Sequence, residues 1–211
     1  MNIVKVDNIN NISLNNEEIK LVNNQKKLVI NISGCVKIYE TIVNEKNTMV
    51  INLLENSSLE YHKLNKDSVN TTLIINAENK SSIIYNNSMQ INDFSDFNII
   101  SNVRGNDNNI IIKISSVLTK GELTIKADAN VLNDTKGNEV SENIKVLNVN
   151  NSNCTVKPNL LVSSNEVLAT HNTIITKIPD DYLLYLNSKG INILQAKELI
   201  INSYIKNNLN S

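Results

Sequence analysis

The feature that most constrains this chain is the regular return of short β-branched runs. Four such runs begin at Leu28, Met49, Thr72 and Phe97, separated by segments rich in Asn, Ser, Asp and Lys. Later runs cover residues 110–114, 122–127, 143–149 and 159–162. The first four starts follow one another at intervals of roughly twenty to twenty-five residues, a period typical of stacked β-coils in which each coil is one structural repeat.

The segments between the runs limit how the strands can be connected. None of them has the pattern of an amphipathic helix, so parallel strands cannot be joined by helical crossovers. Two all-β folds remain, namely a sandwich or barrel of antiparallel hairpins and a solenoid of stacked coils. The chain has only five glycines and no Asn-Gly or Asp-Gly dipeptide, which are the signals of tight hairpins. The pattern therefore favours the solenoid.

Asparagine makes up roughly a fifth of the chain, which by itself would suggest disorder. Here it alternates with Ile, Val and Leu, and the apolar content is 41%, so we expect a folded chain. Asn tolerates the left-handed backbone conformation needed at coil corners. Stacked Asn amides can also form hydrogen bonds from one coil to the next, as in cross-β ladders.

Composition excludes several functional classes. A formal net charge of −1, one arginine (Arg104) and no tryptophan argue against nucleic-acid binding. The chain shows neither a signal-peptide core nor an apolar run long enough to span a bilayer, so we expect a cytoplasmic protein without membrane association. In that reducing compartment the two cysteines, Cys35 and Cys154, are expected to be free thiols.

The C-terminal part changes from a strand pattern to a helical one. Pro179 suits the first turn of a helix, and Asp180 and Asp181 complement the helix dipole there. Gly190 is expected to end this helix, and Asn192 to cap a second one. We therefore divide the chain into a β-helix core, residues 1–176, and a helical subdomain, residues 177–211. The helices carry enough apolar residues either to cap the end of the solenoid or to dock a partner.

The chain offers few residues for chemistry. It has no phosphate-binding loop, nucleophile elbow, H-E-x-x-H or C-x-x-C motif, and His62 is expected to be a surface residue. Asp93 and Asp96 could pair as acid and base in a β-helix carbohydrate-active enzyme. Cys154 and His171 are 17 residues apart, and if each coil has roughly twenty residues they could lie on neighbouring coils. Thiolate and imidazole suit iron or zinc, but two ligands do not close a metal site.

A longer pattern near the C-terminus is more specific. Residues 157–160 read K-P-N-L, His171 follows Pro158 by thirteen residues, residues 184–191 read L-Y-L-N-S-K-G-I, and Ala196 stands in the last helix. This pattern resembles the end of the SufB/SufD family, the scaffold proteins of the SUF iron–sulfur cluster assembly system. The match covers the stretch from Lys157 onward, with Lys189 in place of the arginine of the family pattern. The chain is shorter than typical members, and its sequence predicts no N-terminal helical region.

The resemblance implies a mainly β fold, a right-handed parallel β-helix with a small C-terminal helical subdomain, and a non-catalytic role. The C-terminal helices would dock a SufC-like ABC-type ATPase, and the terminal β-coils would pair with a SufB-like scaffold. No cofactor would be stably bound, although a transient iron–sulfur cluster could form at the scaffold interface. The residues expected to bind the ATPase are Pro179, Tyr182, Leu183, Tyr185, Leu186, Gly190, Ile191, Leu199, Ile200 and Tyr204.

Two departures from the family pattern favour SufD over SufB. SufB-type chains have glutamate directly after the histidine and cysteine six residues before the proline, where this chain has Asn172 and Ser152. A SufD-type histidine would face the partner scaffold, which makes His171 a candidate metal residue. Cys154 is a displaced second candidate. The alternative is a minimal SufB-like scaffold that pairs with itself and carries a nascent cluster on Cys154 and His171.

Overall fold

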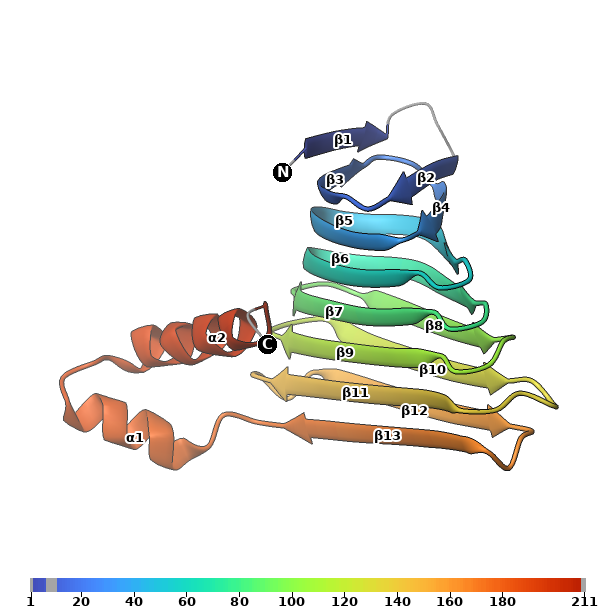
Figure 1. Cartoon of the computed structure of the whole chain (residues 1–211). Helices are drawn as coiled ribbons and strands as arrows, with labels where there is room; N and C mark the ends of the chain where they lie inside the picture. Colours follow the sequence, from blue (N-terminus) through green and yellow to red (C-terminus); the bar gives the residue numbers. More distant parts are fainter. Residues whose placement is uncertain (1, 7–10, 210–211) are drawn as a thin grey trace.

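The computed structural model describes residues 2–6 and 11–209, with side chains described as far as Ile205. Parallel strands stack into a solenoid with two helices at its C-terminal side (Figure 1). The predicted parallel β-solenoid with C-terminal helices is therefore confirmed. The strands are β1 (Asn2–Val6), β2 (Asn11–Asn15), β3 (Glu18–Asn23), β4 (Lys27–Ser33), β5 (Cys35–Leu53), β6 (Ser58–Ala77), β7 (Ser82–Ile91), β8 (Ser95–Val103), β9 (Asn109–Leu118), β10 (Glu122–Val131), β11 (Asn138–Asn148), β12 (Asn153–Val162) and β13 (Val167–Thr176).

The strands form two stacks that share the long, bent strands β5 and β6. One stack runs β1-β3-β5-β6-β7-β9-β11-β13, and the other runs β2-β4-β5-β6-β8-β10-β12. The sequence interval between in-register partners grows along the chain: Leu28 pairs with Met49, whereas Ile99 pairs with the more distant Ala127. The coils therefore lengthen towards the C-terminus, and the solenoid widens in that direction (Figure 1).

The core lies between the two stacks and follows from strict alternation along the strands. In β8 every second residue from Ser95 to Val103 is buried, and the residues between them are half-exposed. Successive side chains of a strand point to opposite faces, so one set enters the solenoid and the other faces outward. The buried set includes Ile30, Ile51, Ile75 and Ile99, each fully covered.

Asparagine stabilises both the outer face and the corners of the coils. The residues that form a ladder in register on the outer face are Asn31, Asn52, Asn76, Asn102 and Asn130. From Asn52 onward, each Nδ2 donates to the Oδ1 of the preceding coil's Asn, at 2.8, 2.8, 3.0 and 3.1 Å. Other asparagines have positive φ, as at Asn44 (52°) and Asn56 (59°). Both predicted roles of asparagine, the ladder and the corners, are confirmed.

We predict that Asn76→Ala destabilises the fold by about 1–2 kcal/mol, because it removes two ladder hydrogen bonds worth about 1 kcal/mol each. Urea unfolding of the variant and the wild type measures the difference. Asn70→Ala is the matched control, since Asn70 is exposed on the same strand and lies outside the ladder. Equal losses from both substitutions would contradict a stabilising ladder.

Two helices follow the last strand, α1 (Asp180–Ser188) and α2 (Ile193–Leu209). Gly190 has a φ of +83° just beyond α1, and the Gln195 N–H donates to Asn192 Oδ1 at 2.9 Å, so the predicted helix end and cap are confirmed. Pro179 is extended and precedes α1 as its N-cap, so its predicted place in the first turn is wrong by one position. Neither helix, within the described residues, is long and apolar enough to cross a membrane.

The helices do not cap the solenoid, so that alternative is wrong. Helix α2 packs beside β7 and β9, and both helices project sideways from the solenoid (Figure 1). A small apolar cluster anchors them, in which Ile178 and Ile205 pack with Val117 and Leu147 of the solenoid. The apolar side chains that meet the helices therefore lie on the flank of the solenoid, away from its C-terminal end.

Candidate functional site

The last coil of the solenoid, formed by β12 and β13, is open. Within the described residues β12 pairs only with β10 and β13 only with β11, so each strand has one free edge. On β12 the side chains that point inward, Val156, Pro158 and Leu160, are only half-buried. On β13 most residues are exposed on both faces. A free edge carries unpaired backbone donors and acceptors and invites a further strand, so this end is a candidate interface.

Cys154 and His171 both lie in this open coil, on opposite stacks. Cys154 on β12 is in register with Leu123, and His171 on β13 is in register with Glu142. The predicted placement on neighbouring coils is wrong, because the coils here are longer than that prediction assumed. The two strands are joined by a turn and run in opposite directions (Figure 1). Cys154 is the second residue of β12 and therefore lies at the end of that strand far from the turn, whereas His171, the fifth residue of β13, lies nearer to the turn. The two residues are therefore offset by roughly 13 Å along the strands.

The environments of these two residues differ. The Cys154 thiol is half-buried against the core, and burial raises its pKa, which disfavours the thiolate that binds metals. His171 is exposed on the inward-pointing side of β13, the side that would be covered by a further coil. No group of three or more His, Cys, Asp or Glu residues suited to a metal ion occurs in the described part of the chain.

Glu142 is a residue of this region that the sequence reasoning missed. It points into the core of β11 between Val140 and Ile144, and its side chain is fully buried. Neither carboxylate oxygen has a hydrogen-bond partner. Burial, and to a lesser degree the charge of Asp128, raises the pKa of Glu142 to about 7. The sequence feature that could have identified Glu142 as buried is its position in the alternating stretch V-S-E-N-I, where an apolar residue is expected.

We predict that Glu142→Gln stabilises the protein at high pH only. The folded-state pKa is raised from 4.5 to about 7. Below pH 4.5 the carboxyl group is protonated in both the folded and the unfolded chain, so its titration does not lower the stability. As the pH rises to about 7, ionisation in the unfolded chain progressively destabilises the fold. Above that pH the variant should be more stable than the wild type by about 3 kcal/mol.

Urea unfolding at about pH 5 and pH 8 measures this difference across the relevant window. Glu139→Gln is the matched control, because Glu139 is exposed on the same strand. A stability gain from Glu142→Gln that is the same at both values of pH would contradict a buried, titrating carboxyl group.

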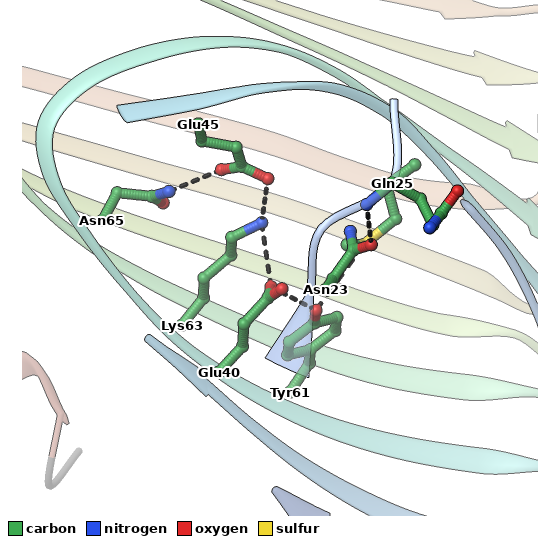
Figure 2. Close-up of polar contacts among 8 residues, drawn as sticks. Asn23, Gln25, Glu40, Glu45, Tyr61, Lys63 and Asn65 are labelled. Atoms are coloured by element: carbon green, nitrogen blue, oxygen red, sulfur yellow. Dashed lines mark hydrogen bonds and ion pairs between the residues drawn. The ribbon is translucent and has the colours of Figure 1, made fainter. Parts of the chain in front are cut away.

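A second polar group lies inside the solenoid at the bend of β5 and β6, as Figure 2 shows. Lys63 Nζ lies 3.0 Å from Glu40 Oε2 and 2.5 Å from Glu45 Oε1. Tyr61 donates to Glu40 Oε2 at 2.7 Å, and Asn65 Nδ2 donates to Glu45 Oε2. All five side chains are buried.

The charges of this network depend on one another. Burial lowers the pKa of Lys63, but the charges of Glu40 and Glu45 outweigh burial and raise it overall, so the lysine stays protonated. Sequence reasoning could not find the network, because Glu40 and Glu45 lie in one coil and Lys63 lies in the next. Each member has a charged or hydrogen-bonded partner within the network, although Glu40 Oε1 and Asn65 Oδ1 accept no hydrogen bond. Because all five side chains are buried, we assign the network a structural role.

We predict that Lys63→Met destabilises the protein by about 3–5 kcal/mol, because it leaves two buried carboxylates without a cation. The free energy of unfolding in urea is the readout. Lys136→Met is the control: Lys136 pairs with Glu166 at 3.5 Å on the exposed surface, where a pair contributes less than about 1 kcal/mol. A loss from Lys63→Met no larger than that of the control would contradict the role of the network.

The two helices present the second candidate surface, and the predicted partner-binding residues divide into two groups there. Leu183, Ile200 and Tyr204 pack against the anchoring cluster on the solenoid flank, and Leu186 and Ile191 are also half-buried. The exposed group is Pro179, Tyr182, Tyr185, Gly190 and Leu199. Leu184 and Leu194, which are 66% and 80% exposed, extend this apolar surface although the prediction left them out.

The remaining candidates lie away from both surfaces. His62 faces outward on β6, where it stacks on Tyr39 with 5.1 Å between ring centroids and where its Nε2 lies 2.5 Å from Glu60. Cys35 is a free, exposed thiol at the start of β5. Asp93 is exposed in the turn before β8, and its Oδ1 accepts a hydrogen bond from the Phe94 N–H. None of these arrangements suggests a reaction.

Comparison with known proteins gives one result that bears on both surfaces. Residues 101–204 match the family model described as "SUF system FeS cluster assembly, SufBD core domain". The matched segment begins in β8 and ends in α2, so it contains the open coil and the helices. No curated protein matches the chain.

Proposed function

We propose that this chain belongs to the SufBD core family of the SUF iron–sulfur cluster assembly system, whose core-domain model matches residues 101–204, and that it acts there as a non-catalytic, SufD-like scaffold subunit. We place it in the cytoplasm, with residues 177–211 as the ATPase-docking subdomain. The observation that carries the proposal is that the matched region holds both uncovered surfaces, the open coil and the exposed apolar face of the helices.

The helices are the proposed dock for a SufC-like ABC-type ATPase. Their exposed apolar side chains, among them Tyr182, Leu184 and Tyr185, are each more than 60% exposed. Two exposed tyrosines supply rigid, amphipathic contacts of the kind found at interface hot spots. Since Ile178 and Ile205 fix the helices to the solenoid, a movement of the bound ATPase would be transmitted to the scaffold.

The open coil is the proposed surface for a second scaffold. A partner's terminal strands would satisfy the free edges of β12 and β13 and cover the half-buried side chains between them. His171 would then be enclosed at the junction, where a transient cluster could form as cargo. Asn172 and Ser152, which stand where the SufB pattern has glutamate and cysteine, favour a SufB-like partner. The alternative partner is a second copy of this chain, with Cys154 and His171 as ligands.

We predict that Tyr185→Glu and Leu199→Glu each abolish co-purification of the SufC-like ATPase from the same organism. Loss of a hot-spot side chain costs about 2 kcal/mol, or roughly thirtyfold in affinity. Both side chains are exposed, at 62% and 53%, so the fold should be unaffected. Point variants are preferable to truncation after Lys177, which would also remove Ile178 and Ile205 and uncover the solenoid flank.

Leu132→Glu is the matched control, because Leu132 is 51% exposed and directly follows β10, which ends on the side of the solenoid opposite the helices (Figure 1). The wild type and this control should retain the ATPase. If both helix variants also retain it, the dock lies elsewhere. If the folded wild type fails to retain it, the proposed partner is wrong.

A further inference from the structure

Glu142 and His171 are stacked at the open end of the solenoid. They are in-register neighbours on β11 and β13, and they follow Tyr85 and Ile112 in one column of inward-pointing residues. Neighbouring strands lie about 4.8 Å apart, so the two side chains leave the backbone close together on the same face. His171 is thus the outermost residue of the column, and Glu142 lies directly beneath it.

Glu142 lacks a partner that its burial calls for. Its side chain is fully covered, yet neither oxygen accepts a hydrogen bond. The charge that acts on it is that of another carboxylate, Asp128, which disfavours its ionised form. A buried carboxylate is strongly destabilising unless it is paired with a cation, hydrogen-bonded or bound to a metal. Its unused coordination sites and its position under His171 therefore point to a ligand from outside the chain.

We propose that Glu142 and His171 are two ligands of one divalent first-row metal ion, such as Fe²⁺, at the open end of the solenoid. Carboxylate and imidazole together suit such ions. This pair replaces Cys154 and His171 as the metal residues within one chain, because Cys154 lies too far along the opposite strand. With two ligands from this chain, the remaining coordination positions of the ion would be filled by water or by residues of a second scaffold. The inference rests on the proposed function only in treating the ion as cargo of cluster assembly.

The test is a titration of the full-length, metal-free chain with Co²⁺ at about pH 8, above the pKa of Glu142. Ligand-field absorption of Co²⁺ reports binding, and a sulfur-to-cobalt charge-transfer band reports a thiolate ligand. We expect Glu142→Gln and His171→Ala each to weaken binding about tenfold or more. Cys154→Ser and the exposed-site control Glu139→Gln should bind as the wild type does, without a thiolate band in any of them.

Each other outcome overturns the proposal. If Co²⁺ binding survives Glu142→Gln, the binding is adventitious or uses other ligands. If a thiolate band appears in the wild type and disappears in Cys154→Ser, the ion is bound by the cysteine. If the wild type binds no Co²⁺ in millimolar metal, the chain has no such site. Misfolding does not confuse the result, since Glu142→Gln removes a buried charge and His171 is exposed. Because the titration uses the isolated chain, its failure is distinguishable from failure of the ATPase dock.

Discussion

The structure depends on the parallel pairing of each coil with the one before it. Because this pairing is in register over most of the strand length, a residue type that recurs at the coil spacing meets its own kind in the next coil. The Asn31–Asn52–Asn76 ladder, the apolar interior and the column that ends at His171 all follow from that single constraint. Where register shifts, between Val43 and Glu45, the strand bends, and the interior there is polar rather than apolar.

The same pairing leaves the last coil incomplete. A solenoid buries a residue only if a further coil covers it, so β12 and β13 are exposed on the side where no further strand follows among the described residues. The helices pack on the flank and leave this end uncovered. Two separate surfaces thus remain, a strand-edged end around His171 and an apolar helical face around Tyr185, which suits a subunit that contacts two different partners at once.

Much of the fold could be predicted because its signals are local and periodic. The spacing of Leu28, Met49, Thr72 and Phe97, the amides of the asparagine ladder, and the cap at Asn192 can each be recognised within a short window of sequence. The candidate site was predicted less well. The open end contains the predicted Cys154 and His171, but the gradual lengthening of the coils places them in one coil, and the neighbour of His171 proves to be Glu142.

The sequence by itself determined the class of fold, since alternation sets which side chains are buried and the repeat length sets how coils stack. It also determined where strands give way to helices. Only the tertiary structure decided which distant side chains meet: that Lys63 lies between Glu40 and Glu45, that Ile178 and Ile205 hold the helices to the flank, and that Glu142 is buried beneath an open coil. These contacts depend on register and coil length summed over many residues, and small local differences in turn length, which short patterns do not encode, change them.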